Sequence, residues 1–399
     1  MGKWKTCTIA DLGTVVGGAT PSTKKPENYD GGTIAWITPK DLAGFSGRFI
    51  SHGERNITEI GLNSCSAKMM PRHSVLFSSR APIGYVAIAK NEVCTNQGFK
   101  SVVPNEDTDY MFLYYLLMNN RHNIEHMGSG TTFKEVSGKT MRSIEVRVPE
   151  SRDEQIRISS MLSAIDDKIE ENERINKNLL EQAQSIYSAW FEQFLPFDGT
   201  MPSDWHIGTI RDIADIKTNS FNPHKNPGVM LEHYSIPAFD AQHFPIFELS
   251  NNVKSNKYIL TKSSVLASKL NPDTKRTWRP MCLSENTVCS TEFIVFEARN
   301  PEHKDFLFSV IDSQPFSDWM CAHTTGSTNS RQRTTPSTTL DFEISVAPDD
   351  VIDEFCSSVT PMYDLISHNL LENQRLSSLR DQLLPRLMSG ELDVSNIDF

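Results

Sequence analysis

The chain has 399 residues, 39 of them basic and 50 acidic, and its formal net charge is −11 at pH 7. Hydrophobic residues make up 38% and charged residues 22%, which is typical of a globular protein and excludes a disordered or fibrous one. At about 150 residues per domain the length predicts two or three domains, and no apolar run approaches the roughly 18 residues of a membrane span.

Residues 1–150 are punctuated by glycine and proline and lean toward β-structure, which predicts a first mixed α/β globule. The N-terminus turns polar within a few residues and lacks an apolar secretory core, so we expect a cytoplasmic protein with no membrane partner. The seven cysteines are scattered and show no C-x-x-C spacing, which argues against a disulfide framework and against a metal site.

Residues 151–198 predict a long acidic helix with ten acidic and five basic side chains. Its apolar and amide residues step alternately by four and three, as the a and d positions of a coiled coil do. These positions are Ile158, Leu162, Ile165, Ile169, Asn172, Asn176, Leu179, Ala183, Ile186 and Trp190.

Residues 199–348 predict a second globule, and residues 349–399 a second helix with a C-terminal tail. The second helix repeats the seam at a constant shift of 197, with Arg380 as its one charged member. We expect Pro361 to separate a short first helix from the main one and Pro385 to end it. The seam positions are Phe355, Val359, Met362, Ile366, Asn369, Asn373, Leu376, Arg380, Leu383 and Leu387.

The two halves of the chain form an internal repeat. WKTCTIADLG at the start recurs as WHIGTIRDIA after Asp204, and SVLFSSR with VCTNQGF is echoed by SVLASKL with VCSTEF. Later in each half, GSGTTFKEVSGKTMRSIEVRVP parallels TGSTNSRQRTTPSTTLDFEISVAP. Four matches in the same order predict two related globules, each followed by a long helix.

The asparagines in the two seams predict how the helices pair. Antiparallel pairing places Asn172 opposite Asn373 and Asn176 opposite Asn369, and a slip of one heptad would bury each amide against an apolar side chain at about 1–3 kcal/mol. Parallel pairing also matches asparagine with asparagine, but it would crowd both globules at one end. We therefore expect an α+β protein in which two globules are joined by an antiparallel coiled coil with a pseudo-two-fold axis, while ordinary amphipathic helices remain the alternative.

Several stretches resemble the specificity (S) subunit of type I restriction-modification enzymes. They are GGATPSTKKPENYDGGTIAWITPKDL, RAPIGYVAIAKNEVCTNQGF, DEQIRISSMLSAIDDKIEENERINKNLLEQAQSIYSAWF and QLLPRLMSGEL. The second half departs from the pattern, having NSFNPHKNPG and NPDTKRTW where the first half has its GGATPST and APIG stretches.

This resemblance implies that each globule reads half of an asymmetric bipartite DNA target and that the helices space the two half-sites. It implies target recognition domains at 1–150 and 199–348, and spacer helices at 151–198 and within 349–399. It also implies double-stranded DNA, two methylation (M) subunits and restriction (R) subunits as partners. The chain itself would be non-catalytic and would hold no cofactor, and its acidic helices would face protein rather than DNA.

Arg and Lys suit phosphates and guanine edges, and Asn and Gln suit adenine, so such residues in loops are the candidate DNA contacts. In the first globule they are Lys24, Lys25, Lys40, Arg80, Gln97, Thr132, Lys134 and Lys139, and in the second Lys269, Lys275, Arg276, Arg279, Asn329, Arg331, Gln332 and Arg333.

Two other functions remain open from the sequence. One is a protein–protein scaffold in which DNA contact is incidental. The other is a modifying enzyme, although Asn271-Pro272-Asp273 and Gly128-Ser129-Gly130 lack the context of a methyltransferase site.

Overall fold

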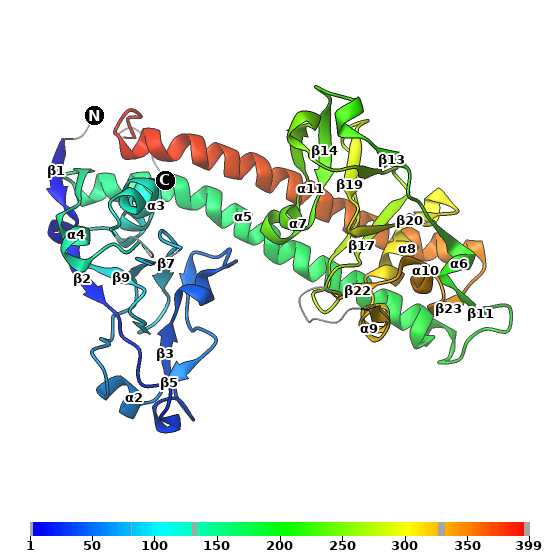
Figure 1. Ribbon diagram of the computed structural model, residues 1–399, viewed down its shortest axis with the longest axis horizontal. Coiled ribbons are helices and arrows are strands. Elements are labelled where there is room, and N and C mark those ends of the chain that lie inside the picture. Colours follow the sequence, from blue (N-terminus) through cyan, green and yellow to red (C-terminus); the bar gives the residue numbers. More distant parts are fainter. Residues whose placement is uncertain (1–2, 81, 130–133, 326–331, 395–399) are drawn as a thin grey trace. The chain divides into compact units, whose positions relative to one another are not determined.

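The computed structural model describes residues 3–80, 82–129, 134–325 and 332–394 (Figure 1). The chain divides into two compact units: unit 1 contains Met1–Glu170 and Arg375–Phe399, and unit 2 contains Glu171–Gln374. The two longest helices, α5 (Arg152–Tyr187) and α11 (Asp349–Met388), each begin in one unit and end in the other. Each unit is therefore completed by helix segments from both halves of the sequence.

Unit 1 is built on a five-stranded sheet of order β2-β9-β6-β7-β4, a three-stranded sheet of order β5-β3-β8 and the pair β1-β10. The strands are β1 (Trp4–Thr8), β2 (Gly13–Gly17), β3 (Ile34–Ile37), β4 (Phe49–Ile50), β5 (Asn56–Ile57), β6 (Val75–Phe77), β7 (Val86–Ala89), β8 (Cys94–Thr95), β9 (Lys100–Pro104) and β10 (Glu145–Pro149). The helices of the globule are α1 (Ile9–Leu12), α2 (Glu59–Asn63), α3 (Tyr110–His126) and α4 (Gly138–Ser143).

Unit 2 has a four-stranded sheet of order β12-β20-β17-β18, a five-stranded sheet of order β13-β16-β19-β14-β15, and the pairs β11-β23 and β21-β22. Its strands are β11 (His206–Thr209), β12 (Ala214–Ile216), β13 (Ser220–Phe221), β14 (Met230–Tyr234), β15 (Ile246–Leu249), β16 (Lys257–Ile259), β17 (Ser264–Ser268), β18 (Thr277–Trp278), β19 (Thr287–Ser290), β20 (Phe293–Ala298), β21 (Thr324–Thr325), β22 (Arg333–Thr334) and β23 (Glu343–Val346). Its helices are α6 (Ile210–Ile213), α7 (Ile236–Gln242), α8 (Lys304–Ile311), α9 (Gln314–Ala322) and α10 (Pro336–Thr339).

Both globules begin with the same strand, helical turn and strand. In each, a threonine and an aspartate three residues later form a capping box: the backbone N–H of Thr8 donates to Asp11 Oδ2 and that of Thr209 to Asp212 Oδ2, both at 2.7 Å. This arrangement satisfies backbone donors that a short helix leaves open at its N-terminus. The repeated opening seen in the sequence thus has the same local structure in both units.

Within unit 2, α5 and α11 lie side by side and run in opposite directions (Figure 1). Asn172 Nδ2 donates a hydrogen bond to Asn373 Oδ1, and Asn369 Nδ2 donates one to Asn176 Oδ1, each at 2.8 Å. Asn172 is fully buried, and Asn369 and Asn373 are nearly so. These partners are those of the antiparallel register described above.

The expectation that Pro361 and Pro385 interrupt the second helix is wrong. Helix α11 runs unbroken through both prolines and ends at Met388. Both proline side chains are exposed, so water can bond the carbonyls that lose their usual partners. Val359 and Tyr363 on either side of Pro361 are almost fully buried, and their packing offsets the local cost of the proline.

Each unit has its own hydrophobic core, and a long helix completes it. In unit 1, Leu384 and Leu387 of α11 pack with the buried faces of α3 and of the five-stranded sheet. In unit 2, Tyr187 of α5 and Phe191 beyond it pack with α8 and with Phe355 of α11. The mixed α and β content agrees with the expected α+β class.

Candidate nucleic-acid interface

Three chain segments meet at one place in unit 1, which we call the unit 1 junction (residues 79–80, 98–100 and 134–136). The backbone N–H of Ser79 donates to the carbonyl of Gly98 at 2.7 Å, and that of Val136 donates to the carbonyl of Ser79 at 2.9 Å. The end of β6, the loop before β9 and the segment before α4 are thereby held together.

A carboxylate organises the cations of the unit 1 junction. Glu135 Oε2 lies 2.9 Å from Arg80 Nε, and Glu135 Oε1 lies 3.3 Å from Lys100 Nζ. Partial burial alone would raise the pKa of the Glu135 carboxyl, but hydrogen bonds from Arg80 and Lys100 outweigh it and lower the pKa. The Arg80 side chain is 47% exposed, so it is held in place while its N–H groups stay accessible to a ligand.

Unit 2 has a corresponding junction, formed by residues 269–270, 292–293 and 332–334. The backbone N–H of Lys269 donates to the carbonyl of Glu292, and that of Thr334 donates to the carbonyl of Lys269, both at 3.0 Å. This repeats the pattern of the unit 1 junction, with the end of β17 in the place of the end of β6 and β22 in the place of the segment before α4.

The charges of the two junctions are arranged differently. In unit 2, Arg333 Nε and Nη2 each lie 3.1 Å from the Glu292 carboxylate, and the Arg333 side chain is 45% exposed. The isolated bridges Arg80↔Glu135 and Leu270↔Arg333 show that Arg333 takes the place of Glu135. Each junction thus presents a half-exposed arginine on a carboxylate, but the arginine comes from a different segment in each.

Of the residues predicted for the first globule, Arg80 and Lys134 belong to the junction, and Gln97 adjoins it. Gln97 is exposed and accepts a hydrogen bond from the Thr20 hydroxyl. Lys134 is exposed, as is Lys139 on α4. Thr132 lies outside the described residues.

The remaining first-globule candidates lie away from these segments. Lys24 and Lys25 are exposed in the loop before a short helical turn at Pro26–Asn28. Lys40 lies in a second turn, Pro39–Leu42, where its Nζ is 2.6 Å from Glu54 Oε2.

In the second globule, Lys269, Gln332 and Arg333 belong to the junction, and the Gln332 carbonyl accepts a hydrogen bond from the backbone N–H of Asn271 at 2.9 Å. Asn329 and Arg331 lie outside the described residues.

The DTKRTWRP cluster is occupied by internal contacts. Lys275 pairs with Asp312 at 3.0 Å, Arg276 with Asp240 at 2.6 Å and Arg279 with Asp305 at 2.6 Å. Trp278 is buried and its ring packs against those of Tyr234, Phe239 and Phe293. The tryptophan therefore belongs to the core of unit 2 and is not presented among the cations.

Sequence reasoning missed Lys100, Glu135 and Glu292. Carboxylates repel phosphates, so the sequence does not mark the two glutamates as candidates, and only the folded chain shows that they hold arginines. Lys100 is the first residue of the KSVVP strand, and the sequence pattern gives no sign that its side chain reaches Glu135.

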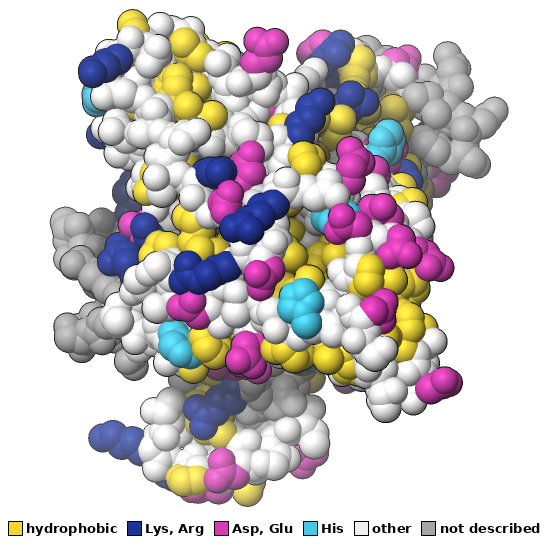
Figure 2. All heavy atoms as spheres, turned by 90° about the vertical axis from the view of Figure 1, so that its right-hand side faces the viewer, with side chains coloured by type: hydrophobic (Ala, Val, Ile, Leu, Met, Phe, Trp, Pro, Cys, Tyr) yellow, Lys and Arg dark blue, Asp and Glu magenta, His cyan; other side chains and the backbone are white. Residues whose placement is uncertain are grey.

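Basic side chains do not form one continuous patch on the face drawn in Figure 2, where Lys and Arg are interspersed with Asp and Glu. Within the described part of the chain, no three His, Cys, Asp or Glu side chains gather as metal ligands would. Among those same residues, every helix is too short or too polar to cross a membrane.

Comparisons with known proteins point to one family. Residues 1–181 match the model of the type I restriction modification DNA specificity domain. The chain is 31% identical to the type I restriction enzyme MjaIX specificity subunit of Methanocaldococcus jannaschii, with 99% of this chain and 94% of the relative covered. It is 29% identical to the type I restriction enzyme EcoR124I/EcoR124II specificity subunit of Escherichia coli over 41% of each chain.

A solved structure shares the fold. The S subunit of a type I restriction-modification system from M. genitalium superposes with a TM-score of 0.58 at 16% identity, and 97% of this chain and 96% of that one are covered.

Proposed function

This chain belongs to the specificity subunits of type I restriction-modification systems, and from that premise we propose that it reads an asymmetric, bipartite DNA target. The globule of residues 1–150 takes one half-site and the globule of residues 199–348 takes the other. The chain performs no catalysis itself, but docks methylation and restriction subunits that do. A cytoplasmic location goes with this role.

The main observation that supports the proposal is the pair of junctions. Each globule brings three segments together around a half-exposed arginine that a carboxylate orients, Arg80 on Glu135 and Arg333 on Glu292. An arginine with a fixed guanidinium plane suits two-pronged hydrogen bonding to a guanine edge or a phosphate. Because the flanking side chains differ between the junctions, the two half-sites should differ in sequence.

The helix pair supports a fixed gap between the half-sites. The buried bonds between Asn172 and Asn373 and between Asn369 and Asn176 fix one register, because a slip would leave amides unsatisfied. Two helices paired in a single register have a single length, so the gap that they set between the half-sites has a single value.

The acidic helices support the docking of protein partners. Asp153 on α5 and Asp350 and Glu354 on α11 have exposed side chains. Such carboxylates repel DNA phosphates, so we assign these helix faces to the methylation and restriction subunits.

The test is selection of duplexes from a random pool by the full chain, alone and with the methylation subunit of its own system. We expect two short, different motifs to be enriched at one fixed gap. Enrichment of no motif in either experiment would favour the scaffold alternative, to which the internal pairing of Lys275, Arg276 and Arg279 lends some support. Methyl transfer by the chain alone would favour the enzyme alternative.

A further inference from the structure

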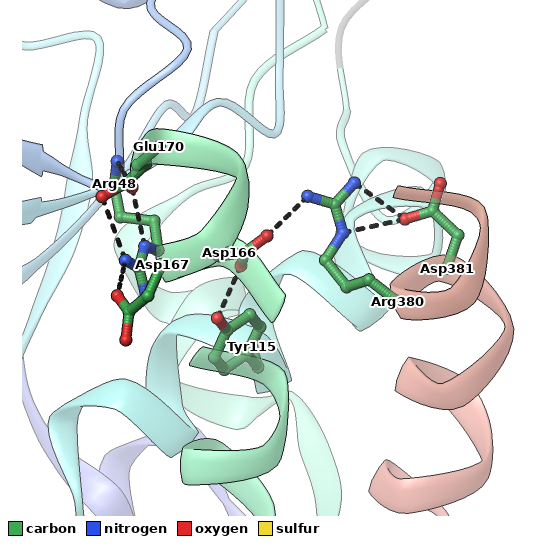
Figure 3. Close-up of polar contacts among 7 residues, drawn as sticks. All are labelled: Arg48, Tyr115, Asp166, Asp167, Glu170, Arg380 and Asp381. Carbon is green, nitrogen blue, oxygen red and sulfur yellow. Dashed lines mark hydrogen bonds and ion pairs between the residues drawn. The ribbon is translucent and has the colours of Figure 1, made fainter. Parts of the chain in front are cut away.

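Unit 1 ties the edge of its five-stranded sheet to helix α5 through a buried arginine. Arg48 directly precedes edge strand β4, and its side chain is 5% exposed. Arg48 Nε and Nη2 donate to the two carboxylate oxygens of Glu170 at 2.8 and 3.0 Å, and Nη2 also pairs with Asp167 (Figure 3). We call Arg48, Asp167 and Glu170 the Arg48 clamp.

Unit 2 ties its four-stranded sheet to helix α11 in the same manner. Arg279 directly follows edge strand β18, and its side chain is 15% exposed. Arg279 Nη2 donates to Asp364 Oδ1 at 2.9 Å and Nη1 donates to Ser367 Oγ at 3.3 Å, while Asp305 of α8 holds the other side of the guanidinium. We call these four residues the Arg279 clamp.

The helix residues of the two clamps occupy equivalent positions in the repeat. Asp167 and Asp364 differ by 197 residues, and so do Glu170 and Ser367, which is the constant shift between the two helix seams.

The arginines themselves are not equivalent. Leu76 pairs with Ala87 across β6 and β7, and its counterpart in the repeat, Leu266, pairs with Trp278 across β17 and β18. Trp278 therefore corresponds to Ala87, and the next residue, Arg279, corresponds to Ile88. In unit 1 an added edge strand, β4, lies beside Ile88 and brings Arg48 to the helix instead, and the backbone N–H of Ile88 donates to the carbonyl of Arg48 at 2.7 Å. Two different segments thus supply a guanidinium to the same helix position.

A second attachment lies next to each clamp, also at equivalent positions. In unit 1, the hydroxyl of Tyr115 on α3 donates to Asp166 Oδ2 at 2.6 Å (Figure 3). In unit 2, the hydroxyls of Ser309 on α8 and Tyr363 on α11 lie 2.8 Å apart. Asp166 and Tyr363 again differ by 197 residues. Each globule is therefore held on a long helix both through one of its own helices and through the edge of a sheet, beside further polar contacts such as Ser159 Oγ with Asp109 in unit 1 and His303 with Asp353 in unit 2.

We propose that Arg48 and Arg279 are positioning residues that fix the angle of each globule on its helix and so hold the gap between the two DNA half-sites to one value. This inference rests on the proposed function. With the clamp intact, the sheet edge is fastened to the long helix as well as the globule's own helix, and the globule cannot tilt about the contacts of that helix. Without the clamp, the globule stays attached through α3 or α8 but its sheet edge is released.

The contacts favour this role over a role in stability alone. Buried ion pairs contribute little net stability because desolvation offsets their attraction, but their two-pronged geometry fixes orientation. The apolar attachment is separate: Ile158 and Leu162 of α5 lie in the core of unit 1, and Phe355 and Val359 of α11 in that of unit 2.

The experiment compares full-length Arg48→Gln and Arg279→Gln variants with the unsubstituted chain, each with the methylation subunit, in selection from random duplexes. We expect both variants to enrich the same two motifs but at two or more neighbouring gaps, where the unsubstituted chain selects one. The matched control is Arg174→Gln, which removes an arginine that pairs with Glu171 on α5 and whose side chain is 72% exposed. The control should keep the single gap.

A second measurement reports on the clamp without DNA. Hydrogen exchange of the amides of Ile88 and Lys90, which donate to the carbonyls of Arg48 and Ile50, should quicken at least tenfold in Arg48→Gln while α3 keeps its protection. If Arg48→Gln unfolds unit 1, the variant Asp167→Ala with Glu170→Ala removes the acceptors from partly exposed positions instead, and the same broadening of the gap is expected.

A single unchanged gap in the clamp variants, with exchange quickened at Ile88 and Lys90, would overturn the positioning role and leave the proposed function standing. Loss of the motifs themselves in Arg48→Gln, with the fold intact, would also overturn it. If the unsubstituted chain enriches no motif, the proposed function fails and the inference falls with it.

Discussion

The two long helices end in different chemical surroundings. Where α5 ends in unit 2, Tyr187 and Phe191 pack against Trp205, Phe306 and Phe355. Where α11 ends in unit 1, the residues equivalent to Tyr187 and Phe191, at a shift of 197, are Leu384 and Met388. They pack among aliphatic side chains and against α3. The repeat has kept the position of each contact and changed the side chains that fill it, and the clamps and junctions show the same behaviour.

The largest expected effect comes from the helix ends. Phe191 and Met388 are 3% and 4% exposed and occupy equivalent positions. Phe191→Ala should lower the free energy of unfolding by about 3–5 kcal/mol and Met388→Ala by about 2–5 kcal/mol, with the phenylalanine the costlier of the two because more ring contacts are lost. Denaturant unfolding followed by tryptophan fluorescence measures both. A larger loss in Met388→Ala would contradict the comparison.

The asparagine pair at the helix centre gives the next effect. Asn172→Leu should cost about 1–3 kcal/mol because it leaves Asn373 buried without its donor, whereas the double variant Asn172→Leu with Asn373→Leu should be near neutral or more stable. A double-mutant cycle in urea provides the measurement. Additive losses would mean that the two amides do not interact.

The junctions offer a comparison of DNA binding. Arg80→Gln should relax base preference in one half-site and Arg333→Gln in the other, each with about a tenfold loss of affinity for the selected target. Binding to duplexes with single base changes, at one salt concentration, checks this. If both variants relaxed the same half-site, the assignment of one globule to each half-site would be wrong.

The smallest effect concerns the Arg279 clamp, which has a lysine beside it. Burial and then the charge of Arg279 lower the pKa of Lys304 to about 8. A lysine with a lowered pKa in the folded chain binds fewer protons than in the unfolded chain, so its presence costs stability below about pH 8 and the cost disappears as the pH rises toward 10.5.

The matching variant is Lys304→Met. Its stability advantage over the unsubstituted chain should shrink between pH 8 and 10.5 by on the order of 1 kcal/mol. Subtracting the free energy of unfolding of the unsubstituted chain from that of the variant at each pH removes the contributions of cysteines and tyrosines that titrate in the same range. Urea unfolding at several pH values gives the result, and an advantage that grows with pH would contradict the sign.

The spacing of residues in the sequence predicts the helices and their register because a heptad seam repeats locally. The expected breaks at Pro361 and Pro385 rest on the local penalty of proline in a helix, and they are wrong because helix α11 continues through both residues. Charge alone made Arg276 and Arg279 candidate DNA contacts. The sequence does not reveal that Asp240, Asp305 and Asp364 lie within reach of them, because those pairs join residues 26 to 85 positions apart.

The junctions were predictable in part for the same reason. Arg80 and Arg333 were found as cations in loops, but the glutamates that orient them lie 55 and 41 residues away along the chain. Contacts between segments that are distant in the sequence can be identified only once the fold is known.

The most direct test of the central claim lengthens the helix pair without touching either clamp. Duplicating residues 171–177 in α5 together with 368–374 in α11 adds one heptad to each helix at matching positions. At 1.5 Å per residue this adds about 10 Å, so the gap between the selected half-sites should grow by about three base pairs. Enrichment of the same two motifs at the original gap would contradict the account.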